Sequence, residues 1–253
     1  MNEDNMSVLV EYSSTTEKSV RGGLLDLFRK NPIPDEQILS NLGIFLESKN
    51  LARLLFLDFI YKLIVPIQGV IMDFGTRWGQ NLSIFESLRG IYEPFNRHRK
   101  LVGFDTFAGF LNVNEEDGNA PLMKTGQLAT PTDYANYLAQ VMLCKEQLNP
   151  LAHVKKFDIR VGDASEEIHK YLEAYPATVI ALVYFDFDLY EPTRNCLLAV
   201  ENRLTKGSVV VFDELNDEDS PGETAALMEV IGLGNIRLQR YPYASRVSYY
   251  VVE

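Results

Sequence analysis

From residue 67 onward, short apolar runs alternate along the chain with longer helical stretches. The runs are Val70–Phe74, Leu101–Phe104, Phe157–Val161, Val179–Phe185, Ser208–Phe212, Asn235–Leu238 and Val247–Val252. The stretches between them predict helices near residues 80–92, 132–147, 165–174, 192–204 and 222–232. Strands that alternate with helices form βαβ units, so we expect a seven-stranded, mostly parallel α/β sheet with helices on both faces.

Both ends of the chain depart from this alternation. The last two runs have no helix between them, and residues 240–245 suit a hairpin, so the final strands should be antiparallel at one edge of the sheet. Near the other end, Pro34 predicts a helix start that leads to about Glu47, and a second helix, Leu51–Val65, stops at Pro66. We therefore expect an N-terminal helical extension over residues 1–66, of which polar residues 1–23 are partly mobile, and one α/β domain over residues 67–253.

One connection is much longer than the others. Residues 110–131 are polar and rich in turn formers. A connection of this length in a compact domain is usually functional and often forms a lid over a site. The sequence leaves two interpretations open, a lid and a disordered surface insert.

Composition and charge exclude several classes of protein. The chain has 24 Lys and Arg against 35 Asp and Glu, a net charge of −11, whereas a protein that binds nucleic acid or an anionic membrane needs a basic face. The most apolar stretch, residues 51–67, contains three charged side chains and is too short to span a bilayer. Two cysteines and an acidic N-terminus without a signal-peptide pattern point to reduced thiols in the cytoplasm.

The first candidate site follows the first strand, where Asp73, Gly75 and Gly79 form an Asp-x-Gly-x-x-x-Gly sequence. Glycines are needed where the backbone turns sharply and approaches a ligand closely. The third glycine of the dinucleotide pattern is absent, which argues against a pyrophosphate ligand. The pattern is typical of the S-adenosylmethionine loop of class I methyltransferases, and a purely structural turn is the other interpretation.

Acidic residues also end the second and third strands. Asp105 follows the second strand, 30 residues after Gly75, where a carboxylate can accept hydrogen bonds from both hydroxyls of a ribose. Asp163 follows the third strand, where an acid commonly lies beside an adenine amino group in this fold. It also suits the N-cap of the helix that begins near Ser165, and both roles are compatible.

The next two strands each end in a pair of acids, Asp186 with Asp188 and Asp213 with Glu214. The carboxyl ends of neighbouring parallel strands face the same crevice, so four carboxylates should converge there. Like charges at close range are unfavourable without a cation. A hard divalent metal with oxygen ligands, Mg²⁺ above all, is the simplest solution, and helix capping with solvated acids is the alternative.

In this order, over residues 60–232, the motifs resemble those of the macrocin O-methyltransferase family. The distinctive parts are Asp105-Thr106-Phe107 with Gly109, and Asp186-Phe187-Asp188-Leu189-Tyr190. The resemblance implies a Rossmann-like class I methyltransferase that uses S-adenosylmethionine and Mg²⁺ to methylate a sugar hydroxyl of a glycosylated natural product, as in antibiotic biosynthesis. We assign the cofactor to these motif positions: Asp73, Gly75, Thr76, Gly79, Asp105, Thr106, Phe107, Asp163 and Ala164.

The resemblance is weakest where the acceptor would bind. Glu214 and Ser208 stand where the family usually has Asp and Gly, and the N-terminal region and residues 110–131 match poorly. A catechol-type O-methyltransferase and a non-catalytic S-adenosylmethionine-binding module are the alternative functions.

Roles can be assigned within the acidic cluster. We expect Asp186, Asp213 and Glu214 to be metal ligands and Asp188 to be the catalytic base, with Asp186 and Asp188 interchangeable on sequence alone. The partner should be a small-molecule glycosylated acceptor. Apolar surface on the helices of residues 35–65 favours a homo-oligomer.

Overall fold

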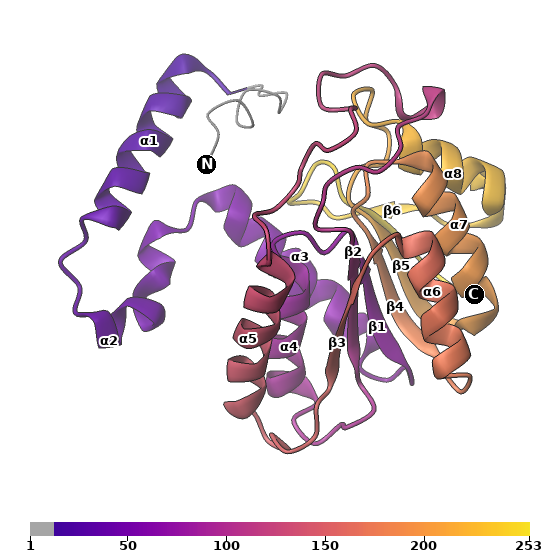
Figure 1. Ribbon diagram of the computed structural model, residues 1–253, viewed down its shortest axis with the longest axis horizontal. Coiled ribbons are helices and arrows are strands. Elements are labelled where there is room, and N and C mark those ends of the chain that lie inside the picture. Colours follow the sequence, from indigo (N-terminus) through magenta and orange to yellow (C-terminus); the bar gives the residue numbers. More distant parts are fainter. Residues whose placement is uncertain (1–12) are drawn as a thin grey trace.

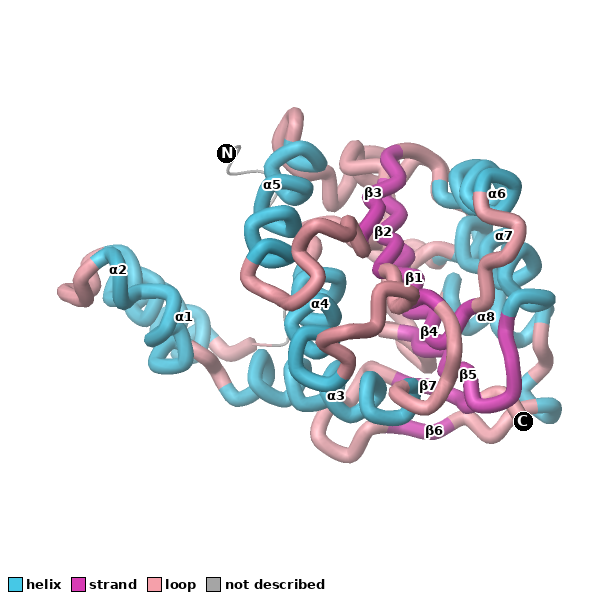
Figure 2. Tube along the Cα trace, turned by 90° about the horizontal axis from the view of Figure 1, so that it is seen from below, coloured by secondary structure: helices cyan, strands magenta, loops and turns pink. Residues whose placement is uncertain are grey.

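The apolar runs form one seven-stranded sheet in the computed structural model, which describes residues 13–253 (Figures 1 and 2). The strand order is β3-β2-β1-β4-β5-β7-β6. The first five strands in this order pair in parallel, while β7 is antiparallel to β5 and to β6. The bounds are β1 Val70–Phe74, β2 Leu101–Asp105, β3 Phe157–Val161, β4 Ile180–Phe185, β5 Leu204–Phe212, β6 Gln239–Arg240 and β7 Ser248–Val251. The predicted mostly parallel sheet with an antiparallel end is therefore confirmed.

Helices cover the two faces of the sheet in groups of three (Figure 1). One face carries α3 (Ser48–Ile64), α4 (Gln80–Tyr92) and α5 (Tyr134–Gln147), and the other carries α6 (Ala164–Ala174), α7 (Tyr190–Val200) and α8 (Gly222–Val230). Alternate residues of β1 reach opposite faces, so that Ile71 packs in the first core and Met72 in the second. Within residues 13–253, no helix is long and apolar enough to cross a membrane.

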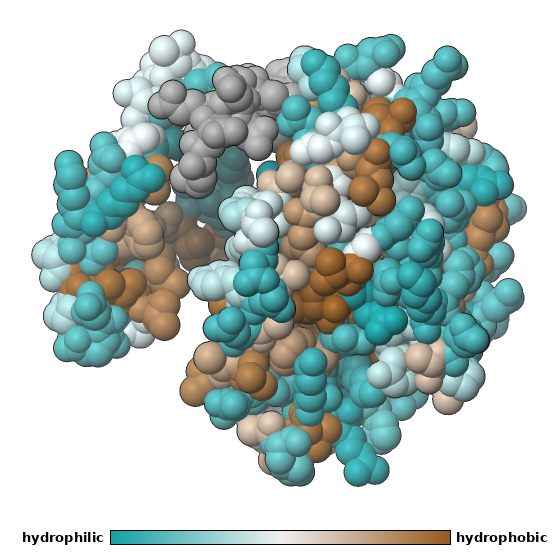
Figure 3. Space-filling model, in the orientation of Figure 1, coloured by the Kyte–Doolittle hydropathy of each residue, from teal (hydrophilic) through white to brown (hydrophobic). Residues whose placement is uncertain are grey.

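The N-terminal extension divides into two parts. Helix α3 packs against the sheet and buries Phe56, Ile60 and Ile64. The preceding arm consists of α1 (Thr15–Arg29), α2 (Asp35–Ile38) and the 3-10 helix η2 (Leu39–Phe45), and within these ranges no residue is buried. The arm extends away from the domain at the left of Figures 1 and 2, and Figure 3 shows apolar surface on it.

Three expectations differ from the structure. The apolar run Asn235–Leu238 is not a strand: Leu233–Asn235 form a 3-10 turn after Gly232, and the short β6 begins at Gln239. The helix expected over residues 35–47 becomes 3-10 after Ile38. The side chains of Ser40 and Asn41 hydrogen-bond the carbonyl oxygen of Gln37, and such bonds compete with regular helix geometry.

The third difference is helix α1, which lies partly in a segment expected to be mobile. The sequence signal for the start of α1 is a capping box, which the sequence analysis missed. In it, the Ser14 hydroxyl and the Glu17 carboxylate each accept the other residue's backbone N–H. Predictions for residues 1–12, including the absence of a signal peptide, lie outside the described residues.

Charged side chains are buried between α4, α5 and the start of β3. Arg89 donates to Glu146 at 2.8 Å, and Lys156 lies 2.6 Å from the same carboxylate. Glu86 is fully buried beside them, and among the described residues its two oxygens have no hydrogen-bond partner. Burial raises the pKa of Glu86 to about 7, although Lys145 and Arg89 act in the opposite direction.

Glu86 should therefore make stability depend on pH. The folded protein holds a proton on Glu86 that the unfolded chain releases above its ordinary pKa of 4.5, so the stability from this proton is complete below pH 4.5 and is lost as pH rises through about 7. We expect Glu86→Gln to reduce the fall in unfolding free energy between about pH 5 and pH 8 by roughly 1–3 kcal/mol, after allowance for screening. Urea unfolding at each pH measures the unfolding free energy, and Glu173→Gln, at an exposed position, is the control. Equal pH slopes for Glu86→Gln and the wild type would contradict this assignment.

Candidate active site

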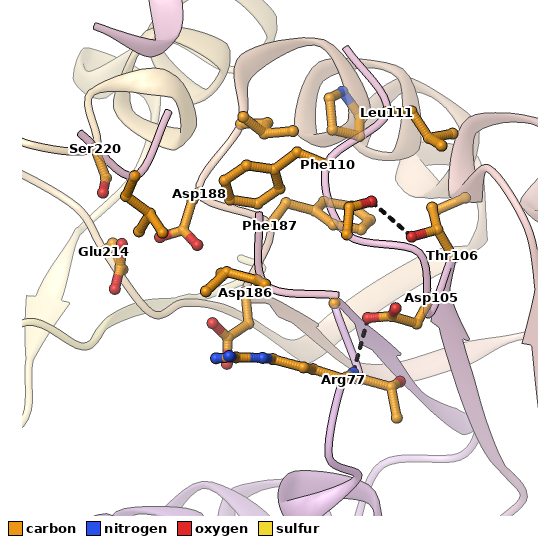
Figure 4. Close-up of a pocket in the computed structure, with 18 of the residues that line it drawn as sticks. Arg77, Asp105, Thr106, Phe110, Leu111, Asp186, Phe187, Asp188, Glu214 and Ser220 are labelled. Atoms are coloured by element: carbon orange, nitrogen blue, oxygen red, sulfur yellow. Dashed lines mark hydrogen bonds between the residues drawn. The ribbon is translucent and has the colours of Figure 1, made fainter. Parts of the chain in front are cut away.

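A cavity of about 490 Å³ opens at the edge of the sheet where the parallel strands end. It is lined by the loops that follow β1, β2, β3, β4 and β5, together with Arg53 from α3 and Arg246 from the loop before β7. In Figure 4, Asp105 lies on one side of the cavity and Asp188 and Glu214 lie on the other. The fold thus brings predicted site residues from distant parts of the chain, such as Asp105, Asp188 and Glu214, together around one cavity.

The loop after β1 requires its glycine because two loops approach closely. Gly75 has φ +87°, and a Cβ atom at this position would lie only 2.0 Å from the carbonyl oxygen of Asp186. Thr76 closes the turn, since its hydroxyl donates to the carbonyl oxygen of Asp73 at 3.0 Å. Gly75 and Thr76 line the cavity, so the loop after β1 lies directly against any ligand that occupies it.

Asp105 organises the loops on this side of the cavity. One carboxylate oxygen accepts the backbone N–H of Arg77 at 2.7 Å, and the other accepts the N–H of Phe107 at 2.6 Å. Burial raises the pKa of Asp105, and these two backbone donors oppose the rise. Because each carboxylate oxygen has two lone pairs, Asp105 can still accept hydrogen bonds from a ligand in the cavity. The neighbouring Thr106 hydroxyl donates to the carbonyl of Gly109 at 2.7 Å (Figure 4).

Other predicted cofactor positions divide between the cavity and its support. Asp163 is the N-cap of α6, where it accepts the N–H of Ser165 at 2.8 Å, and it also lines the cavity with Ala164. Among the predicted cofactor residues, all within the described chain, Asp73, Gly79 and Phe107 do not line the cavity. Asp73 is fully buried beneath the loop, and burial raises its pKa to about 6.

The acidic residues converge as predicted, and the guanidinium of Arg53 lies between two of them. It donates to Asp213 at 2.7 Å and to Asp186 at 3.0 Å. Asp213 also accepts the Tyr184 hydroxyl at 2.5 Å. Asp186, Asp188 and Glu214 line the cavity, whereas Asp213 lies behind them.

The carboxyls in this cluster are crowded and poorly solvated. Burial and the neighbouring carboxyls raise the pKa of Asp186 well above its ordinary range, and that of Asp188 to about 6. Burial, followed by the adjacent Asp188, raises the pKa of Glu214 to about 10. Arg246 compensates in part, with its guanidinium 2.5 Å from Glu214 and 3.0 Å from Asp217. Four carboxyl groups thus face two guanidinium groups, so without a further cation the crowding favours protonated carboxyls.

A buried glutamate that the sequence analysis missed supports both acidic loops. Glu223, at the start of α8, accepts the backbone N–H of Phe187 at 2.9 Å and those of Asp188 and Glu214 at 3.4 Å. Burial raises the pKa of Glu223 to about 8. Arg53, Arg246 and Glu223 lie outside the recognisable motifs, and only their contacts across the fold reveal them.

The donor chemistry of the cluster fits a hard divalent cation. All four side chains offer carboxylate oxygens, and Oε2 of Glu214 is buried without a hydrogen-bond partner among the described residues. Within residues 13–253, however, no three acidic, His or Cys side chains already stand together in a metal-binding group. The Arg53 guanidinium instead bridges Asp186 and Asp213.

Comparison with known proteins decides the family. Neither protein-family profiles nor curated protein sequences give a match. Among solved structures, the calicheamicin methyltransferase CalS11 is 39% identical with a TM-score of 0.93, over 99% of this chain and 97% of CalS11. The chain belongs to the same O-methyltransferase family as CalS11. This agrees with the resemblance to the macrocin O-methyltransferases.

One further structure supports this assignment, and another supports the fold alone. The apo structure of CalS11 is 37% identical with a TM-score of 0.85, over 95% of this chain and 96% of that chain. The O-methyltransferase NovP, at 17% identity and a TM-score of 0.59 over 79% of each chain, shows a shared fold. The protein is thus an S-adenosylmethionine-dependent methyltransferase with the predicted class I fold.

In this methyltransferase, the long connection arches over the top of the sheet (Figure 1) and packs against the segment that follows β4. Phe110 and Met123 form a small apolar cluster with Leu189. Asp117 ties the segment to α7, because its carboxylate accepts the backbone N–H of Tyr190 at 2.5 Å. Phe110 also lines the cavity, so residues 110–131 form part of its wall, and their movement as a lid stays a prediction.

Removing the Asp105 carboxylate should weaken binding of the methyl donor. We expect Asp105→Ala to reduce affinity for S-adenosylhomocysteine by about 1–3 kcal/mol, the range for hydrogen bonds to a charged group. Titration calorimetry measures the affinity, and Glu173→Ala, on an exposed face of α6, is the control. Unchanged affinity in folded Asp105→Ala would remove Asp105 from the donor site.

Proposed function

We propose that this enzyme transfers the methyl group of S-adenosylmethionine to a sugar hydroxyl in the biosynthesis of a glycosylated natural product. The observation that carries the proposal is the 39% identity to CalS11 over nearly the whole of both chains. CalS11 is described as a TDP-rhamnose 3'-O-methyltransferase of calicheamicin biosynthesis. By this analogy, the acceptor is a deoxysugar carried on a nucleoside diphosphate or on an assembled glycoside.

The two sides of the cavity suit the two substrates. The side formed by Gly75, Asp105 and Asp163 offers a close backbone approach and carboxylates for ribose and adenine, which suits the methyl donor. The acidic side, with Asp188 and Glu214, suits the hydroxyl that is methylated. Methyl transfer from a sulfonium is an in-line displacement, so holding both substrates across one cavity supplies much of the catalysis.

We further propose that Asp186, Asp213 and Glu214 hold Mg²⁺. Their oxygen donors, the excess of carboxyl groups over nearby guanidinium groups and the unpartnered Oε2 of Glu214 support this assignment. When bound, Mg²⁺ would lower the pKa of the acceptor hydroxyl, which is otherwise a very weak acid.

Asp188 is the stronger candidate for the catalytic base. Asp186 is already paired with Arg53, whereas Asp188 lines the cavity without an arginine partner in the described chain. Its pKa of about 6 leaves it mainly as a carboxylate at neutral pH, able to accept a proton from a nearby hydroxyl. The hydrogen bond from its backbone N–H to Glu223 helps to hold it in place.

The acceptor can be tested with purified enzyme, S-adenosylmethionine, Mg²⁺ and a substrate panel. We expect methylation of a TDP-deoxysugar or of a glycosylated macrolide or polyketide, and little turnover of catechols. EDTA should reduce the rate by at least about a hundredfold, because a metal contributes several kcal/mol of charge stabilisation, and added Mg²⁺ should restore it. Mass spectrometry of the methylated products measures the turnover of each acceptor and the rates with EDTA and with Mg²⁺.

Each arm of this assay tests one part of the proposal. If catechols are methylated and no sugar is accepted, the sugar acceptor is wrong and only the assignment as an O-methyltransferase remains. Full turnover in EDTA would contradict the proposed role of Mg²⁺. Asp188→Asn should lower turnover by about 10²–10⁴-fold while S-adenosylhomocysteine still binds, as expected for loss of a general base. Near wild-type turnover of Asp188→Asn would move that role to another residue.

We also propose that the N-terminal arm packs against a second copy of this chain. Its apolar side chains Val20, Leu27, Leu39 and Ile44 are 65, 67, 81 and 64% exposed. A helix of 15 residues such as α1 is only marginally stable in water without tertiary packing. Closed homo-oligomers are the commonest assemblies of soluble proteins, and they would give this arm the packing that its own domain does not provide.

The arm's role predicts the oligomeric state in solution. Light scattering should give a mass that is a multiple of 28.7 kDa. The double variant Leu27→Asp with Ile44→Asp should shift the mass toward that of the monomer, whereas Leu148→Asp, on the exposed end of α5, should not. A wild-type monomer would contradict the proposal.

A further inference from the structure

The only described basic side chain that bridges two of the four carboxylates is Arg53. It projects from α3, in the N-terminal extension, into the cluster formed by the ends of β4 and β5. One terminal nitrogen donates to Asp213 at 2.7 Å, and the other donates to Asp186 at 3.0 Å. Nothing in the sequence singles out Arg53, since it interrupts an apolar helix as a surface residue would.

Further contacts fix the orientation of the Arg53 guanidinium. The nitrogen that bonds Asp186 also donates to the Asn81 side chain at 3.1 Å, and the guanidinium lies 5.7 Å from the centre of the Tyr184 ring. The rigid, planar fork of arginine holds two acceptors in a defined relation, which the flexible ammonium of lysine does less well. Arg53 therefore sets the relative positions of Asp186 and Asp213.

The same two carboxylates belong to the proposed Mg²⁺ ligand set. Their negative charges repel each other, and a cation between them removes the repulsion. A guanidinium and a divalent cation would compete for these oxygens, because an oxygen that coordinates a metal directly gives up its bond to the guanidinium. Arg246 is not equivalent, since it is half exposed and pairs with only one of the proposed ligands, Glu214, together with Asp217.

We propose that Arg53 is an internal counter-cation: it holds Asp186 and Asp213 in place as a ligand pair, and a divalent cation must displace it from at least one of them. Arg53 is thus a positioning residue that lowers the affinity of the site for metal while keeping the two ligand side chains in a defined relation. This inference rests on the proposed metal function of the cluster. It adds that an arginine from the N-terminal extension determines how tightly the metal binds.

Direct metal binding tests the inference without reference to turnover. Mn²⁺ serves as the probe, with free Mn²⁺ measured by electron paramagnetic resonance on the full chain near pH 8. We expect Arg53→Met to bind Mn²⁺ about 10–100-fold more tightly than the wild type, because binding no longer breaks hydrogen bonds between charged groups. Arg53→Lys should stay closer to the wild type, since it keeps the competing charge. Arg194→Met removes an arginine paired with Glu229 outside the cavity and should have no effect.

Thermal stability provides a second test of the counter-cation role of Arg53. In EDTA, Arg53→Met should melt below the wild type because Asp186 and Asp213 lose their counter-cation. Mn²⁺ should then raise its melting temperature by more than it raises that of the wild type, as tighter binding requires. Arg53→Gln gives the same comparison should Arg53→Met fail to fold.

The outcomes separate this inference from the function on which it rests. If the wild type binds Mn²⁺ and folded Arg53→Met or Arg53→Gln binds it no more tightly, the counter-cation role is wrong while the metal site stands. If neither the wild type nor any variant binds Mn²⁺, the proposed metal function fails and takes this inference with it. Tighter binding by the neutral variants with an unchanged Arg194→Met supports the displacement.

Discussion

The crowding of carboxylates at the end of β4 and β5 is the constraint around which the catalytic end of this methyltransferase is arranged. Asp186, Asp188, Asp213 and Glu214 stand where two neighbouring parallel strands stop, and Glu223 lies beneath them. Burial disfavours their charged forms and raises the pKa to about 6 for Asp188 and to about 10 for Glu214. Such an arrangement persists in a fold only when cations and hydrogen bonds from other elements support it.

The supporting groups come from elements on both sides of the sheet. On one side α3 supplies Arg53, and on the other the start of α8 supplies Glu223, which accepts backbone N–H groups of both acidic loops. A chain of polar contacts runs from Asp73 through Asn81 to Arg53 and on to Asp213. Asp73, buried beneath the loop that follows β1, is therefore linked by hydrogen bonds to the acidic cluster at the ends of β4 and β5.

The N-terminal extension has two physical roles. Helix α3 is part of the core through Phe56, Ile60 and Ile64, and part of the site through Arg53. The arm before it, residues 13–46, buries no side chain in its own chain. A division of the chain at residue 66 therefore follows the sequence pattern, but in the structure α3, which lies before this boundary, contributes to both the core and the candidate active site.

Local sequence determined the strands, most of the helices and the carboxylates that end the strands. A buried parallel strand is a short apolar run, and the residues just after it must lie at the carboxyl edge of the sheet, so Asp105, Asp186 and Asp213 could be placed without coordinates. Gly75 could also be predicted as a site residue from the sequence. The reason that it must be glycine is a tertiary contact, because a Cβ atom there would collide with the carbonyl oxygen of Asp186. Where local signals were weak or misleading, as at Asn235–Leu238, the prediction was wrong.

Tertiary structure alone decided which side chains balance these carboxylates. Arg53 and Asp213 are 160 residues apart, and an arginine in an apolar helix looks the same whether it faces water or a buried acid. Glu223 is likewise one acid among 35 Asp and Glu until the fold brings it under two loops. A single residue can signal its own chemistry, but electrostatic compensation depends on distances between residues, and only the packing of α3 and α8 against the sheet sets those distances.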